Sequence, residues 1–174
     1  MKEHGILIIG GGLAGLTAAI HLALEGQDVA VIEMNPYPHH KVCGEYVSNE
    51  VLPYLNRLGI NPNSVGAIPI SQFEISTQDG FVVDTELPLG GFGISRYAFD
   101  QLLYKRAVEL GVTFYFEKVI STAFDNDYFT INTKSESYTS RIVIGAYGKR
   151  SVLDKDLNRE FSKKKQSWLA VKAH

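Results

Sequence analysis

The segment Ile6–Met34, ILIIGGGLAGLTAAIHLALEGQDVAVIEM, decides the fold of this chain. Residues 5–9 form a continuous apolar run that is typical of a buried strand. Residues 13–25 repeat apolar side chains at helical spacing, and Gly26 ends that helix. Residues 29–33 are a second apolar, β-branched run. The segment therefore predicts a βαβ unit of about 30 residues.

Three glycines between the first strand and the helix match the spacing G-x-G-x-x-G. We expect Gly10 to make the tight turn, Gly12 to admit a pyrophosphate and Gly15 to let helix and strand pack closely. Glu33, at the end of the second strand, can accept hydrogen bonds from ribose hydroxyls and repels a 2′-phosphate. The unit thus predicts a dinucleotide ligand, FAD or NAD rather than NADP, and its context disfavours a glycine-rich turn without a ligand.

The overall composition is that of an ordinary globular protein. Of 174 residues, 45% are apolar and 21% charged, and the net charge of −2 gives no reason to expect a nucleic-acid partner. No apolar run approaches the ~18 residues of a membrane span, and the N-terminus does not resemble a secretion signal. The single cysteine, Cys43, excludes an internal disulfide and fits a cytoplasmic location.

The chain beyond Glu33 does not continue as a plain series of βα units. A long loop precedes a helix over residues 49–58, and residues 67–87 alternate as strands around an Asp79–Gly80 turn before LGGFG ends this excursion. A second helix follows Ser95, its N-cap, and ends at Gly111. A buried strand at 112–116 then leads into antiparallel strands at 119–124, 128–133 and 137–144. This order favours FAD over NAD.

The whole arrangement resembles the FAD-binding domain of the glutathione-reductase-like flavoproteins. The resemblance rests on GGGLAG, the acidic strand end, the inserted β excursion, the β-meander and the final G-A-x-G. Within these proteins, KVCGE (41–45) and SRYAFDQLLYKRAVELGV (95–112) resemble the geranylgeranyl reductase branch of the p-hydroxybenzoate hydroxylase-like group. The resemblance implies an α/β fold with a Rossmann-like FAD-binding domain at 1–62 and 96–158, and a partial antiparallel substrate-domain sheet at 63–95 and 159–174.

The resemblance also assigns roles to individual residues. It implies that cofactor contacts come from Gly10, Gly12, Ala14 and Gly15 at the pyrophosphate, Glu33 and Met34 at the adenosine ribose, Arg96 at the phosphate or ribityl chain, Val119 at adenine, and Gly145 and Ala146 under the dinucleotide. Lys41 is a further candidate for a phosphate contact, with a solvated lysine as the alternative. Gly44 would permit close approach of the isoalloxazine ring. Cys43 would touch the flavin or the substrate as the candidate catalytic residue, with a buried structural cysteine as the alternative.

Two departures from the family pattern affect the functional prediction. GAYGKRS (145–151) carries Tyr147 where related hydroxylases have an aspartate, which fits the reductase-like branch better. The family's second FAD motif lies beyond residue 174, so we expect a truncated chain that does not catalyse a reaction by itself.

The predicted function is that of an FAD-dependent oxidoreductase, a reductase or a monooxygenase. It would act on a hydrophobic small molecule with NAD(P)H as the electron donor. A partial nucleotide-binding domain without activity and an NAD-dependent dehydrogenase are the alternatives. We expect no metal site, because His39 and His40 are adjacent on a loop and lack partners at ligand spacing. The oligomeric state stays open.

Overall fold

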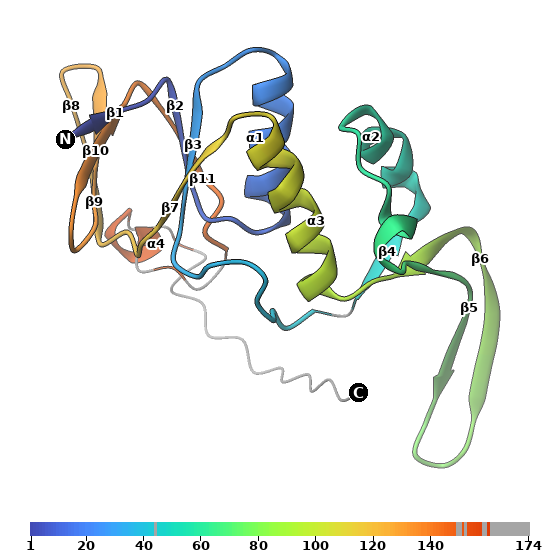
Figure 1. The fold of residues 1–174 in the computed structure, drawn as a ribbon. Helices are drawn as coiled ribbons and strands as arrows, with labels where there is room; N and C mark the ends of the chain where they lie inside the picture. The colour runs from blue at the N-terminus through green and yellow to red at the C-terminus, as the bar shows by residue number, and fades with distance from the viewer. Residues whose placement is uncertain (44, 149–150, 152, 158–159, 161–174) are drawn as a thin grey trace.

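The computed structural model describes residues 1–43, 45–148, 151, 153–157 and 160. Its centre is a parallel sheet with the strand order β11-β2-β3-β7 (Figure 1). The strands are β2 (Ile6–Ile9), β3 (Val29–Glu33), β7 (Thr113–Phe116) and β11 (Ile142–Gly145). β2 and β3 are buried along their whole length, as their continuous apolar sequences predict for a sheet covered on both faces.

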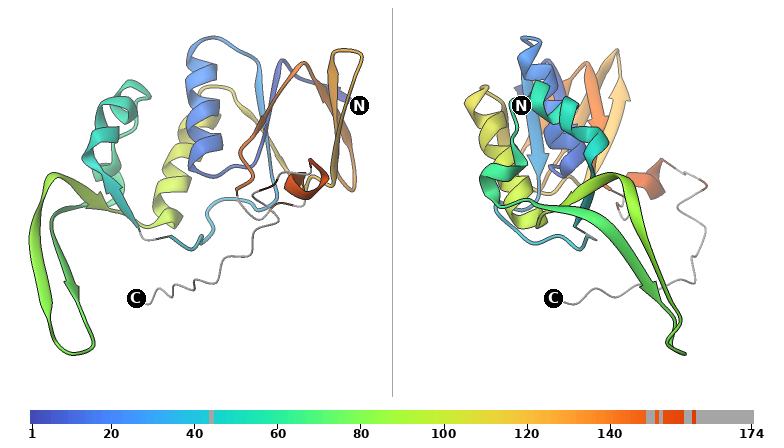
Figure 2. Two further views of the ribbon diagram at one scale, coloured as in Figure 1. Left: turned by 180° about the vertical axis from the view of Figure 1, so that it is seen from behind. Right: turned by 90° about the vertical axis from the view of Figure 1, so that its right-hand side faces the viewer.

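Two helices cover one face of the parallel sheet, as Figures 1 and 2 show. They are α1 (Leu13–Leu24) and α3 (Arg96–Glu109), and their apolar faces pack on Ile6, Ile8 and other buried residues in one core. The predicted N-cap of α3 is confirmed, because the Ala98 amide donates to Ser95 Oγ at 3.2 Å.

An antiparallel sheet covers the opposite face. Its order is β1-β10-β9-β8, with β1 (Lys2–Glu3), β8 (Ser121–Asp125), β9 (Tyr128–Asn132) and β10 (Ser137–Ser140). Ile131 and Tyr138 from this sheet pack with Leu7 and Ile32 in a second core. The result is three layers, helices, parallel sheet and meander, which confirms the predicted fold class. The short strand β1, parallel to β10, was not foreseen.

Residues 137–144 do not form the single strand that the sequence predicted. β10 ends at Ser140 and β11 begins at Ile142 in the other sheet, where it runs parallel to β2. Ser140 explains the break: its hydroxyl donates to Gly5 O at 3.0 Å and accepts from the Ile142 amide at 3.2 Å. A buried side chain thus satisfies backbone groups that no strand partner reaches at this corner.

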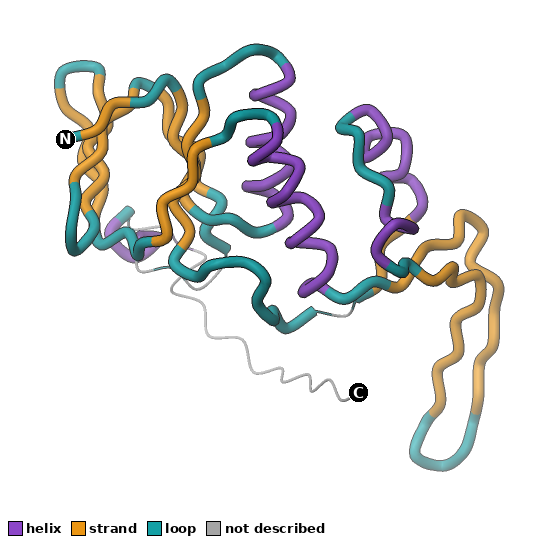
Figure 3. Tube along the Cα trace, in the orientation of Figure 1, coloured by secondary structure: helices purple, strands orange, loops and turns teal. Residues whose placement is uncertain are grey.

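The excursion between β3 and α3 carries a third sheet, β4-β6-β5 (Figure 3). Its elements are β4 (Tyr46–Ser48), a 3₁₀ turn (Asn49–Val51), α2 (Leu52–Arg57), a second 3₁₀ turn (Pro62–Val65), β5 (Ile68–Ser76) and β6 (Val82–Gly93). The β5–β6 hairpin projects away from the three layers (Figures 1 and 2). A short helix, α4 (Leu153–Asp156), follows β11.

LGGFG ends the excursion as predicted, and residues 89–93 do so as the last five residues of β6, ahead of α3. The glycines serve packing here: a Cβ at Gly91 would lie 2.4 Å from Tyr46 Cε2, and the Tyr46 hydroxyl donates to Gly90 O at 3.0 Å. β4 lies in the stretch 1–62 that was predicted as FAD-binding domain, yet it pairs with β6 and so belongs to the third sheet. Residues 161–174, predicted as part of this sheet, lie outside the described residues. Among the described helices, none has the length and apolar character needed to cross a membrane.

Candidate functional site

Two glycines of the loop between β2 and α1 are required by the protein's own packing. Gly10 has φ +103°, and a Cβ there would lie 2.5 Å from Ala146 O. A Cβ at Gly15 would lie 1.9 Å from Gly10 O, so any side chain would push α1 away from β2. The Ala146 amide donates to Ile9 O at 2.8 Å, which fixes the end of β11 against this turn.

Gly12 is different, because no described residue fills the space in front of it. Its φ of −79° suits any residue, and Arg96 Nη2, at 3.8 Å, is the only described atom within 4 Å of a Cβ placed there. Gly12 begins α1 without a side-chain cap, and no acidic residue lies in the first turn. An open approach, a helix N-terminus and a guanidinium fit a pyrophosphate. Ala14 is exposed on that first turn.

Glu33 lies at the carboxyl end of β3 and is 7% exposed. Its carboxylate accepts from the Gly11 amide at 2.6 Å and from the Asn35 amide at 3.2 Å. Each carboxylate oxygen can accept more than one hydrogen bond, so capacity for ribose hydroxyls remains. The carboxylate therefore also anchors the glycine loop, a role that the motif did not predict.

Asp100 forms a buried charge cluster beside the loop. Its side chain is fully buried and accepts from Arg96 Nε at 2.7 Å and Arg96 Nη2 at 2.8 Å, a bidentate pair. Lys41 Nζ lies 3.4 Å from Asp100 Oδ2 and 3.8 Å from Glu33 Oε2, and it donates to Gly11 O at 3.3 Å. The Lys41 side chain is only 23% exposed, so the alternative of a solvated lysine does not describe it.

The pKa of Arg96 follows from this cluster. Burial alone would lower the pKa of the guanidinium, but Asp100 and, to a smaller extent, Cys43 together outweigh burial and raise it above its ordinary value. The side chain therefore stays cationic and faces Gly12. The sequence did not predict a role for Asp100, although an Arg–Asp pair at i, i+4 on a helix is a recognisable signal of an ion pair.

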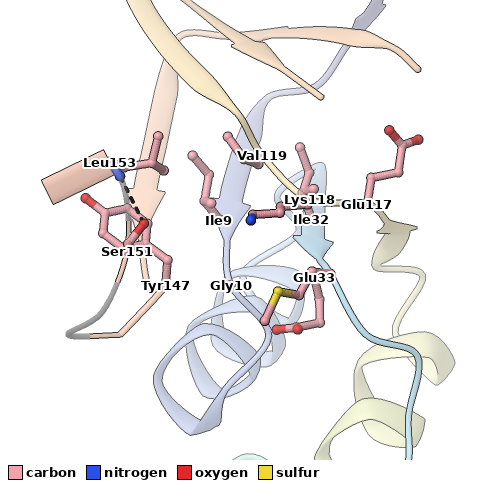
Figure 4. A pocket seen from close by; sticks show the side chains of 11 residues that line it. Ile9, Gly10, Ile32, Glu33, Glu117, Lys118, Val119, Tyr147, Ser151 and Leu153 are labelled. Carbon is pink, nitrogen blue, oxygen red and sulfur yellow. Dashed lines mark hydrogen bonds between the residues drawn. The ribbon is translucent and has the colours of Figure 1, made fainter. Parts of the chain in front are cut away.

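A pocket of about 240 Å³ opens at the carboxyl ends of β2 and β3 (Figure 4). The structure brings four predicted residues together in its wall: Gly10, Glu33, Met34 and Val119. It is also lined by residues without a predicted role, namely Ile9, Ile32, Glu117, Lys118, Tyr147, Ser151 and Leu153. Its place beside Glu33 suits an adenosine, and this position at strand ends is where open α/β sheets bind ligands.

The remaining predicted residues lie near the same edge. Gly145 ends β11, and Ala146 contacts Gly10 as described. Cys43 is half-buried, its thiol interacts with the Arg96 guanidinium, and the Glu45 amide donates to its Sγ at 3.4 Å. Gly44 lies outside the described residues. In the part of the chain that the structure describes, no three potential metal ligands converge.

Comparison with known proteins agrees with this geometry. Residues 5–42 match the family model described as FAD dependent oxidoreductase. The chain is 30% identical to an uncharacterized protein of Methanosarcina barkeri, over 91% of this chain and 41% of that protein. It is 32% identical to digeranylgeranylglycerophospholipid reductase 1 of Methanothermobacter thermautotrophicus, over 87% of this chain and 40% of that protein. The chain thus spans about two fifths of the length of these relatives.

Among solved structures, p-nitrophenol 4-monooxygenase from Pseudomonas putida has the same fold over this region. The TM-score is 0.79 at 19% identity, covering 90% of this chain and 44% of that one.

Proposed function

We propose that this chain is the cofactor-binding part of an FAD-dependent oxidoreductase that acts on a hydrophobic small molecule with NAD(P)H as electron donor. The observation that carries the proposal is the open space between Gly12 and Arg96, next to a pocket walled by Glu33 and Val119. The first of these would take a pyrophosphate and the second an adenosine.

Different residues of the site would bind different parts of FAD. The amides at the start of α1 and the Arg96 guanidinium would hold the pyrophosphate, while Glu33 would accept from the ribose. Val119, on the β7–β8 connection, would lie against adenine together with Met34. FAD, when bound, supplies the hydride-transfer chemistry, and the protein supplies binding, orientation and exclusion of water.

Cys43 is our candidate for the residue nearest the isoalloxazine ring, since its thiol interacts with Arg96 and it is not among the residues that line the adenosine pocket. We place the substrate beyond it, toward the third sheet. The β5–β6 hairpin exposes apolar side chains on this sheet: Phe73 is 46%, Ile75 56% and Phe81 67% exposed. Such exposure supports its assignment to an apolar substrate-binding sheet.

A hydrophobic substrate and a reductive reaction are also the properties named for the lipid reductase relative. A monooxygenase reaction is the second candidate, because the solved structure of similar fold is a monooxygenase. A time course with the full-length protein would separate them: the reductase consumes NAD(P)H without oxygen, and the monooxygenase requires oxygen.

The binding part of the proposal can be tested on this chain directly. We would titrate it with FAD, ADP, FMN and NAD by calorimetry. FAD and ADP should bind, and FMN, which lacks the ADP half, should not. Binding of NAD in clear preference to FAD would favour a dehydrogenase, and no binding of FAD or ADP would refute the proposed site.

A further inference from the structure

Tyr37 lies in the loop after β3, and its ring is held by two other elements. It stacks on Tyr104 of α3, with ring centroids 4.5 Å apart and planes at 17°. It also meets Phe114 of β7 edge-on at 6.1 Å and 87°. These contacts fix the ring so that the Tyr37 hydroxyl lies beside the glycine loop.

That hydroxyl and Gly11 are complementary. The Tyr37 hydroxyl donates to Gly11 O at 2.5 Å, and a Cβ at Gly11 would lie 1.8 Å from the hydroxyl oxygen. Only glycine therefore leaves room for this contact. The Gly11 amide is held in turn by Glu33 at 2.6 Å, so side chains hold both polar groups of Gly11. The three-glycine motif assigned no role to this middle glycine.

The orientation of one carbonyl determines the orientation of the next amide. Tyr37–Pro38 is the cis peptide among the described residues, and the Gly11–Gly12 peptide is trans. In a trans peptide C=O and N–H point in opposite directions. Because Gly11 O points at Tyr37, the Gly12 N–H points away from Tyr37. On the side of a Cβ placed at Gly12, the nearest described atom is Arg96 Nη2 at 3.8 Å.

We propose that Tyr37 is a positioning residue for anion binding, whose hydroxyl fixes the Gly11–Gly12 peptide so that the Gly12 amide meets the pyrophosphate. This inference rests on the proposed function. Lys41 also donates to Gly11 O, at the longer distance of 3.3 Å, but it is shared with Asp100. The Tyr37 hydroxyl is thus the stronger determinant of the peptide's orientation.

The hydroxyl is able to play this part at neutral pH. Burial of the ring, and then the negative charges of Glu33 and Asp100, raise the pKa of Tyr37 above its ordinary value. The phenol therefore keeps its proton and donates to the carbonyl.

The test compares Tyr37→Phe with Tyr104→Phe as a matched control. Each removes one hydroxyl from the same ring stack, and the Tyr104 hydroxyl has no hydrogen-bond partner in the described part of the chain. The dissociation constant for ADP should rise about fivefold in Tyr37→Phe, the effect of one net hydrogen bond, and should stay within twofold in Tyr104→Phe. Urea unfolding checks that both variants fold.

A second readout follows the amide itself. In protein labelled with ¹⁵N-glycine, ADP should shift the Gly12 amide signal in the wild type, and less in Tyr37→Phe, while Gly26 at the far end of α1 stays unchanged. An unchanged ADP affinity in Tyr37→Phe would overturn the inference alone. A wild-type chain that binds neither ADP nor FAD would overturn the proposed function and the inference with it. If Tyr37→Phe does not fold, a wild-type Gly12 signal that ADP leaves in place refutes the inference.

Discussion

Gly12→Ala should weaken ligand binding and Gly15→Ala should weaken stability, although the two glycines lie only three residues apart. At Gly15 the new methyl would lie 1.9 Å from Gly10 O, a backbone atom that cannot rotate away. Alanine normally stabilises a helix by about 0.5–1 kcal/mol relative to glycine. Overpacking of this kind costs about 1–3 kcal/mol or more. We expect a net loss of about 2 kcal/mol in the free energy of unfolding.

At Gly12 the balance is reversed. The backbone, at φ −79° and ψ −172°, accepts alanine without strain, and the methyl meets nothing closer than Arg96 Nη2 at 3.8 Å. Stability should change by less than about 1 kcal/mol, the cost of alanine at an N-cap. The methyl enters the space assigned to the pyrophosphate. ADP affinity should fall at least about tenfold, which corresponds to about 1.4 kcal/mol.

Urea unfolding followed by circular dichroism and calorimetric titration with ADP measure the two effects on the same preparations. Each variant controls for the other, because the substitution is chemically identical. The reasoning fails if Gly12→Ala binds ADP as tightly as the wild type, or if Gly15→Ala is as stable as the wild type.

Three further predictions concern the carboxylates. Glu33→Ala should weaken FAD binding by about 1.5–3 kcal/mol, the range for hydrogen bonds to a charged group, and an unchanged titration would remove Glu33 from the site. Asp100→Asn should lower the free energy of unfolding by about 3 kcal/mol, because it leaves the largely buried Arg96 without its counter-charge, and a urea midpoint equal to that of the wild type would contradict this. Hydrogen bonds from the hydroxyls of Ser135, which has the largest effect, Thr133 and Tyr138 lower the pKa of Glu117 below its ordinary 4.5 in the folded state. The stability that the ionised Glu117 contributes is therefore present above pH 4.5 and is lost as pH falls through the folded-state pKa. Glu117→Gln should therefore be less stable than the wild type at pH 7, with a difference that shrinks in acid, and a difference independent of pH would speak against this.

Much of the fold follows from local patterns. The βαβ unit, α3 with its Ser95 cap, and the meander strands were predictable because hydrophobic periodicity and turn residues agree there. The split between β10 and β11 was not, because an alternating run continues through it and the deciding contact, from Ser140 to Gly5, joins residues 135 positions apart. Likewise, the sequence could not show that Gly90 and Gly91 lie inside a strand, because the contact that requires glycine there comes from Tyr46 on another strand.

The site shows the same division. The motif predicted the tight turn at Gly10 and the close packing at Gly15, since these roles reflect a fixed backbone geometry, whereas ligand binding by Gly12 and Glu33 stays a prediction. It could not show that Asp100 is buried under Arg96, because helix periodicity assigns a charged residue to the surface. Nor could it show Tyr37 at the loop, since that contact depends on the stacking partner in α3.

The position of β11 also has a consequence for how the chain is made. β11 is the last of the strands that the structure describes, yet it pairs with β2, one of the first. Translation adds about 5–20 residues per second, so roughly ten seconds separate their emergence from a ribosome. During that interval one side of β2 is an apolar edge with unpaired amides, the kind of surface that invites aggregation. Because Ala146, directly after β11, packs on Gly10, the candidate site cannot assemble until β11 has emerged and paired with β2.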